Sequence, residues 1–248
     1  MCLPVWNNAK KSWVSYGVLL ALVQLVTACG AADEQGDGPS QKVGNGQATT
    51  NRAAGNVSAP AAGDALVVVF GDSLFAGYQL GRDEGLAPAL ERNLRALGTP
   101  AHVFNAGVSG DTSAAGLMRL GFVLDGLPKK PDLVIIGFGG NDMLRGLSPQ
   151  ATRDNLTAML EELKRRGIAA MLAGMIAAPN MGDDYAKAFN PIYADLSRRY
   201  GAPLYPFILD GVIGDPKLLL ADGIHPNPQG VDKMANGLAP LAARALKE

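Results

Sequence analysis

Five short apolar segments that alternate with helix-like segments place the strongest constraint on the fold of this chain. Residues 65–70 and 132–138 are almost continuously apolar, which is typical of strands that are covered on both faces. The candidate strands are residues 65–70, 101–104, 132–138, 168–175 and 203–208. Because strands and helices alternate regularly, we predict an α/β fold with a parallel sheet and helices on both of its faces.

The segments between and after these strands carry helix signals. The clearest begins at Ser148, a residue type that caps helices, and continues with Pro149 at the first helical position. Apolar residues recur there at helical spacing until Gly167 ends the pattern. The other predicted helices are residues 84–97, 113–127, 183–200 with a bend near Pro191, and 228–245 with a kink near Pro240.

Polar and glycine-rich motifs follow the predicted strands where the strands end. Ligand sites in parallel α/β sheets gather at the carboxyl ends of the strands, so these motifs should converge on one edge. The motifs are Gly71-Asp72-Ser73-Leu74, residues 105–112, Gly139-Gly140-Asn141-Asp142 and Asp222-Gly223-Ile224-His225-Pro226. Together they supply a hydroxyl, a glycine-rich turn, a side-chain amide and an Asp-x-x-His pair.

Ser73 is the candidate nucleophile of this edge. A serine hydroxyl attacks a carbonyl when a base accepts its proton, and an imidazole oriented by a carboxylate is the usual base. The chain has two histidines, and His102 lacks a carboxylate nearby in the sequence, so we expect it to be a surface or structural residue. We therefore predict His225 as the base and Asp222 as its partner. Taken alone, that pair is more often an exposed salt bridge in a loop.

The negative charge that develops on an attacked carbonyl oxygen needs donors that are fixed in place. The backbone N–H groups of Ser73 and Gly110 and the side-chain amide of Asn141 are the candidates. Gly110 and Asn141 are each ordinary turn formers when considered singly. The Ser, Gly, Asn and His motifs, however, occur in this order and each follows a predicted strand. Together they indicate a catalytic site much more strongly than any one of them does alone.

In order and spacing these motifs resemble those of the SGNH/GDSL hydrolase family, over about residues 66–246. They are most similar to the bacterial periplasmic lysophospholipase, acyl-CoA thioesterase and arylesterase group. The resemblance is carried by residues 71–78, 109–113, 139–146, 178–182 and 222–227. This sequence departs from the family pattern at Gly85-Leu86-Ala87-Pro88, where close relatives often have Trp before the Pro. The departure makes the packing near the first helix uncertain, but it does not affect the predicted catalytic residues.

The resemblance implies a flavodoxin-like, three-layer α/β/α sandwich with a five-stranded parallel sheet. It also implies a serine esterase or thioesterase that forms an acyl-enzyme on Ser73. Asp222 and His225 would complete the triad, and Ser73, Gly110 and Asn141 would form the oxyanion hole. No cofactor and no metal are implied.

Other functional classes fit the sequence less well. Phe75 occupies the second glycine position that an α/β-hydrolase elbow requires, and Gly71-Asp72-Ser73 lacks the second glycine of a dinucleotide-binding loop. A metallohydrolase would need three or more clustered His, Asp or Glu ligands, and one histidine beside Asp222 does not supply them. With 22 Lys and Arg against 23 Asp and Glu, no basic excess points to nucleic acid. A carbohydrate O-acetylesterase of the same fold and a non-catalytic lipid- or glycan-binding module stay open as alternatives.

The segment after the fourth predicted strand is a candidate substrate-binding loop. Ile176 and Met181 lie in it together with Pro and Gly residues, and flexible Met side chains suit a groove for variable acyl tails. An ordinary connecting loop explains the same composition about equally well.

The amino-terminal part of the chain has the features of an export signal. Lys10 and Lys11 precede an apolar run of about 15 residues, too short for a membrane span, that ends in Val26-Thr27-Ala28-Cys29 and resembles a bacterial lipobox. We therefore expect a signal peptide over residues 1–28, a lipidated Cys29 and flexible tether over 29–63, and the hydrolase domain over 64–248. An ordinary secretory signal with an incidental cysteine is the less favoured alternative. The protein would then be lipid-anchored on the periplasmic side of a bacterial membrane, with the outer membrane favoured.

Overall fold

The computed structural model describes residues 61–247. The predicted signal peptide, the predicted lipidation site Cys29 and all but the last three residues of the predicted tether lie outside the described residues. Within residues 61–247, the first regular element is strand β1 (Ala65–Gly71), which begins where the sequence predicts the first strand. The predicted start of the hydrolase domain near residue 64 stays a prediction.

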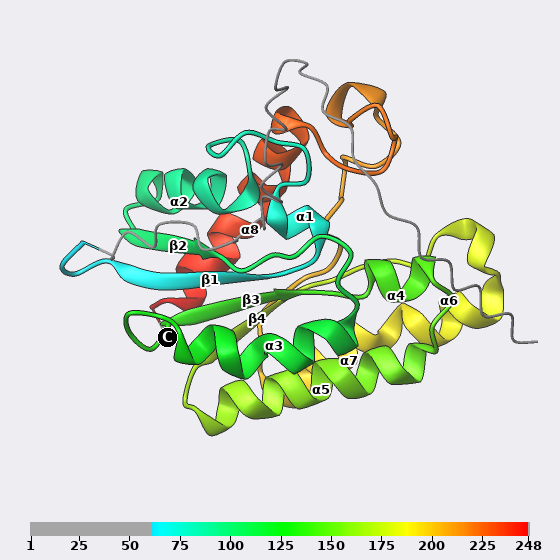
Figure 1. Ribbon diagram of the computed structural model, residues 1–248, viewed down its shortest axis with the longest axis horizontal. Helices are drawn as coiled ribbons and strands as arrows, with labels where there is room; N and C mark the ends of the chain where they lie inside the picture. Colours follow the sequence, from blue (N-terminus) through cyan, green and yellow to red (C-terminus); the bar gives the residue numbers. More distant parts are fainter. Residues whose placement is uncertain (1–60, 248) are drawn as a thin grey trace, which may run out of the picture. The chain divides into compact units, whose positions relative to one another are not determined.

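The described residues form a five-stranded sheet in which every neighbouring pair of strands is parallel (Figure 1). The strands are β1, β2 (Ala101–Asn105), β3 (Leu133–Gly137), β4 (Ala169–Ala173) and β5 (Leu204–Tyr205). Their order across the sheet is β2-β1-β3-β4-β5. This confirms the predicted parallel α/β sheet.

Helices cover both faces of the sheet. Helices α2 (Leu86–Ala96) and α8 (Pro228–Ala245) lie together on one face. Helices α3 (Ser113–Asp125), α5 (Pro149–Arg165) and α7 (Pro191–Tyr200) lie on the other face (Figure 1). Every residue of β3 is buried, as expected for a strand covered on both sides. The predicted three-layer sandwich is therefore confirmed.

The fifth strand is shorter than predicted. The sequence favours residues 203–208, but only Leu204 and Tyr205 form regular strand pairs with β4. Pro206 has no N–H to donate to the ladder, which ends the regular pairing. The N–H of Ile208 still donates to the carbonyl oxygen of Gly174 at 2.9 Å, so this segment stays attached to the end of β4.

The single bent helix predicted over residues 183–200 is two helices, α6 (Asp183–Phe189) and α7. Pro191 cannot donate a backbone hydrogen bond to the preceding turn, so α6 ends and α7 begins with Pro191 at its first position. The side chain of Asn190 accepts a hydrogen bond from the N–H of Ala177 at 2.8 Å, which fixes the break beside the end of β4. By contrast, α8 continues through Pro240 as one helix.

Two short helices follow β1 and β3 directly and have no counterpart in the predicted element list. They are α1 (Ser73–Ala76) and α4 (Gly140–Leu144), and each contains a predicted site residue. The described chain also has two turns of 3₁₀ helix, Pro179–Met181 and Pro216–Leu218.

The predicted first helix begins two residues later than expected, at Leu86 rather than at residue 84. Leu86 and Ala87 are buried, so this segment, which departs from the family pattern, packs into the core through its Leu and Ala side chains.

Candidate active site

Ser73 occupies the first position of α1, immediately after the central strand β1. The side chain of Asp72 caps this helix, because its Oδ1 atom accepts a hydrogen bond from the N–H of Leu74 at 3.1 Å. Gly77 ends the helix in a left-handed conformation with φ of 78°. The tight strand-to-helix turn thus holds Ser73 at the carboxyl edge of the sheet.

Ser73, His225 and Asp222 are connected in a line of hydrogen bonds. The Nε2 atom of His225 lies 2.9 Å from Oγ of Ser73, and its Nδ1 atom lies 2.6 Å from Oδ2 of Asp222. With the Nδ1 proton directed at the carboxylate, Nε2 is free to accept the proton of the serine hydroxyl. The three residues that the sequence singled out are therefore in contact, in the order that nucleophilic catalysis requires.

Asp222 is held as a charged carboxylate. Its Oδ1 atom accepts hydrogen bonds from the backbone N–H groups of His225, at 3.0 Å, and Ile224, at 2.9 Å. These bonds, followed by the bond to the His225 side chain, lower the pKa of Asp222 to about 2. The carboxylate is thus ionised near neutral pH and can stabilise a positive imidazole beside it.

The three predicted oxyanion donors come from three segments: Ser73 begins α1, Asn141 lies in α4 and Gly110 lies in the turn before α3. Gly110 is the third residue of a turn in which the N–H of Asp111 bonds to the carbonyl oxygen of Val108 at 3.2 Å. Its φ of 85° is a conformation that favours glycine. The side-chain amide of Asn141, in α4, donates to the carbonyl oxygen of Asp111 at 3.0 Å. One of the two amide protons of Asn141 is therefore used to hold this loop, and the other can serve a ligand.

Arg119 is a site-supporting residue that the sequence analysis did not identify. Its guanidinium donates to the carbonyl oxygens of Gly71, at 3.0 Å, and Ala106, at 2.7 Å, and to the carboxylate of Asp111, at 2.6 Å. It also lies over the ring of Phe70, 4.4 Å from the centroid. Arg119 thus ties the ends of β1 and β2 to the loop that carries Gly110. The only signal in the sequence is a single arginine within an otherwise uncharged stretch of helix.

Asp142, next to Asn141, is a second support that sequence reasoning missed. Its carboxylate is buried and accepts hydrogen bonds from the N–H of Ser113, at 2.8 Å, from the Ser113 hydroxyl and from the hydroxyl of Thr152, at 3.1 Å. Asp142 therefore fastens α4 to the starts of α3 and α5, and so fixes the position of Asn141.

The remaining predicted residues are placed as follows. Ile176 is 46% exposed in the loop after β4, whereas Met181 is only partly exposed and packs against the core. His102 lies in β2, with Nδ1 3.3 Å from a carboxylate oxygen of Glu91 on α2. His102 thus has a partner distant in sequence and, as predicted, takes no part in the site around Ser73.

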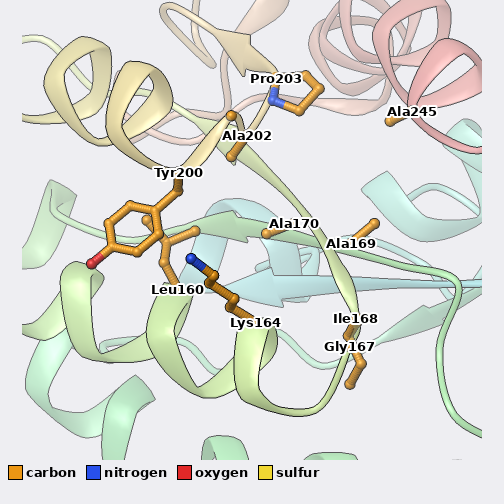
Figure 2. Close-up of a pocket in the computed structure, with 11 residues that line it drawn as sticks. Leu160, Lys164, Gly167, Ile168, Ala169, Ala170, Tyr200, Ala202, Pro203 and Ala245 are labelled. Carbon is orange, nitrogen blue, oxygen red and sulfur yellow. The ribbon is translucent and has the colours of Figure 1, made fainter. Parts of the chain in front are cut away.

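A hollow of about 400 Å³ lies at the opposite edge of the sheet (Figure 2). It begins where β4 starts and is lined mainly by apolar residues, with Lys164 as the one charged side chain among the lining residues. Neither a histidine nor a carboxylate is among its lining residues, so it lacks the groups for ester chemistry that Ser73, His225 and Asp222 bring together.

Neither a metal nor a membrane span is indicated within residues 61–247. No group of three or more His, Cys, Asp or Glu side chains there has an arrangement that could hold a metal ion. None of the helices in this part of the chain is both long enough and apolar enough to cross a membrane.

Burial of Asp72 leads to a prediction about pH and stability. The carboxyl is 3% exposed, and burial raises its pKa from 3.8 to about 7. In the folded protein the neutral acid is favoured. The free energy of unfolding is therefore highest below about pH 4, where the carboxyl is protonated in both states, and it falls as the pH rises to about 7. Asp72→Asn stays neutral and keeps an oxygen for Leu74. We expect this variant to gain stability relative to wild type between pH 5 and 8, on the order of 2 kcal/mol.

Urea denaturation at several pH values measures this difference. Asp83→Asn, which alters an exposed carboxylate beyond α1, is the control and should give a curve parallel to wild type. Parallel curves for Asp72→Asn as well would contradict the assignment of a buried acid that ionises near neutral pH.

Comparison with known proteins supports an assignment for this fold and site. Residues 69–233 match the GDSL-like Lipase/Acylhydrolase family. Esterase TesA of Pseudomonas aeruginosa is 40% identical over 166 residues, which cover 67% of this chain and 81% of the relative. Thioesterase 1/protease 1/lysophospholipase L1 of Escherichia coli strain K12 is 37% identical over 185 residues, covering 73% and 86%.

A solved structure agrees with these matches. AlinE4, described as an SGNH-hydrolase family esterase, is 48% identical with a TM-score of 0.63; the match covers 73% of this chain and 96% of AlinE4. The sequence matches and the structural match therefore point to the same class of protein, the ester hydrolases.

Proposed function

This chain belongs to the GDSL-like lipase/acylhydrolase family and is a carboxylic ester hydrolase, and we propose that Ser73, His225 and Asp222 are its catalytic triad. The observation that carries the proposal is the contact of 2.9 Å between Nε2 of His225 and Oγ of Ser73. Ser73 is the nucleophile and His225 the general base; Asp222 orients the imidazole and stabilises the positive charge that it acquires.

In the proposed reaction, Oγ of Ser73 attacks the carbonyl carbon of the ester while His225 accepts the hydroxyl proton at Nε2. The tetrahedral intermediate collapses to an acyl-enzyme, and His225 gives its proton to the leaving alcohol or thiol. Water then attacks the acyl-enzyme with His225 again as base, which releases the carboxylic acid and restores Ser73. The ionised Asp222 stabilises the imidazolium in both halves of the reaction.

We assign the oxyanion hole to the N–H groups of Ser73 and Gly110 and to the side-chain amide of Asn141. The hydrogen bond of Asn141 to the carbonyl of Asp111 supports this assignment, because it brings α4 and the Gly110 loop together. Arg119 holds that loop against the end of β1, so the donors are fixed before the substrate arrives.

Acyl esters or thioesters with tails longer than acetate are the proposed substrates, with Ile176 and Met181 contacting the tail. We expect kcat/KM to rise from acetyl to medium-chain esters, because each buried methylene contributes about 0.8 kcal/mol, or about fourfold. Ile176→Ser or Met181→Ser should flatten this rise. A series of p-nitrophenyl esters, together with the matching thioesters, measures it.

The control is Leu97→Ser, which alters a side chain of similar exposure, 50%, beyond the end of α2. It should leave the chain-length dependence unchanged. A strict preference of the wild-type enzyme for acetyl esters would contradict the proposal and favour the carbohydrate O-acetylesterase alternative. A complete absence of turnover would favour the non-catalytic binding module.

Lipid anchoring through Cys29 is a further part of the proposal, supported by the Val26-Thr27-Ala28-Cys29 sequence. We propose that the protein is held on the periplasmic side of a bacterial membrane, with the outer membrane favoured by Gly30 after the cysteine. Cys29→Ala should abolish palmitate labelling of the protein in cells. Labelling that persists in this variant would place the anchor elsewhere; Cys2→Ala, which alters the other cysteine of the chain, is the control and should still be labelled.

A further inference from the structure

The ring of Tyr78 lies against the imidazole of His225. The two ring centroids are 4.4 Å apart and the planes are inclined by 37°. Tyr78 is 37% exposed and does not belong to the hydrophobic core of the described chain. Its ring therefore contributes little to the packing of the sheet and helices, and its main aromatic neighbour is the proposed catalytic base.

The backbone beside Tyr78 is held in an uncommon conformation. Tyr78 is the second residue of a turn closed by a hydrogen bond of 3.0 Å from the N–H of Leu80 to the carbonyl oxygen of Gly77. The third residue, Gln79, has φ of 57°, and it is the one residue other than glycine with positive φ in residues 61–247. Its side chain donates to the hydroxyl of Tyr78 at 3.1 Å. Such strain costs on the order of 1 kcal/mol and is often found where a functional side chain must be placed.

The edges and the faces of the imidazole are occupied differently. Asp222 and Ser73 bind its two nitrogen atoms at the ring edge. The buried carboxyl of Asp72 interacts with His225 only electrostatically, without a hydrogen bond between them. Tyr78 is the aromatic side chain that covers a face of the ring. A contact with this face can restrict rotation of the imidazole without competing for either nitrogen.

We propose that Tyr78 is a positioning residue that holds the imidazole of His225 in line with Ser73 and stabilises its protonated form through the aromatic face. This inference rests on the proposed triad. An aromatic face attracts a cation within about 6 Å of its centroid, and His225 becomes a cation in each proton-transfer step. The neutral imidazole gains less from the same contact, so the interaction favours the transition state over the resting enzyme.

Two substitutions separate the aromatic face from its hydroxyl and from simple bulk. Tyr78→Leu keeps an apolar cover over His225 but removes the π face, and Tyr78→Phe keeps the face and removes the hydroxyl. We expect Tyr78→Leu to lower kcat about 3- to 30-fold, equally for acetyl and octanoyl esters, with KM changed by less than about twofold. The acid limb of its kcat/KM profile should move to lower pH, because the imidazolium loses support. Tyr78→Phe should match wild type in both respects.

The experiment measures kcat, KM and pH profiles of these variants beside wild type. Tyr200→Leu, which removes a partly exposed ring at the opposite edge, is the control for general effects of losing a tyrosine. Wild-type behaviour of Tyr78→Leu, a change confined to KM or to long-chain esters, or equal losses in the Leu and Phe variants would overturn the inference. Ser73→Ala is assayed in parallel: if it stays active, the proposed triad fails, whereas its inactivity beside a fully active Tyr78→Leu rejects Tyr78 alone.

Discussion

Ser73→Ala is expected to lower kcat by roughly 10³-fold or more while leaving the protein folded. The reason is that Oγ of Ser73 lies 2.9 Å from Nε2 of His225, so it can attack a carbonyl while it passes its proton to the imidazole. Without it, the proposed oxyanion donors should still bind and polarise the ester, which leaves a small residual rate. Steady-state kinetics with an activated aryl ester measures the loss.

Ser148→Ala is the matched control for this prediction. It removes the same hydroxyl from the start of α5, where Ser148 accepts a hydrogen bond from the N–H of Gln150 at 3.2 Å. Loss of this cap should cost about 1 kcal/mol of stability and leave kcat unchanged. The two variants should therefore show opposite patterns in kinetics and in thermal denaturation. Equal kcat for Ser73→Ala and wild type would end the assignment of the nucleophile.

Asn141→Ala is the second substitution with a large expected effect. A donor aimed at the developing oxyanion stabilises the transition state more than the bound ester, so kcat should fall roughly 10²- to 10³-fold with little change in KM. The variant also loses the bond of 3.0 Å to the carbonyl of Asp111, which loosens the Gly110 loop and acts in the same direction. Asn141→Asp, which keeps the size but has no amide donor, should be at least as impaired.

Asn93→Ala provides the control for loss of an amide side chain. Asn93 donates to the side-chain oxygen of Asn236 at 2.9 Å, between α2 and α8 and away from the site. Its replacement should alter stability slightly and kcat not at all. If Asn141→Ala raised KM and left kcat intact, Asn141 would be a substrate-binding group and not part of the oxyanion hole.

Long, regular patterns in the sequence predicted most of the fold. The continuous apolar runs located β1 and β3, and the proline after Asn227 located the start of α8. Short elements were less accessible: α1 and α4, with four and five residues, are too short to show helical periodicity. The two-residue β5 was overestimated because its apolar run continues past Pro206.

The candidate site was predictable where residue type alone limits the chemistry. With only two histidines in the chain, the choice of His225 beside Ser73 followed from the order of the motifs. The contacts of Arg119 could not be foreseen, because they join the ends of two strands and a loop that meet only in the folded sheet. The contact between the tilted rings of Tyr78 and His225 joins residues 147 positions apart and leaves no local pattern in the sequence.

Covalent labelling with a fluorophosphonate tests the central claim most directly, since the reagent modifies a serine only when a neighbouring base activates it. The native protein should acquire one phosphonyl group, which peptide mass spectrometry should locate on Ser73. Labelling should be absent in Ser73→Ala and strongly slowed in His225→Ala. An adduct on another residue, or undiminished labelling of Ser73→Ala, would contradict the proposed triad.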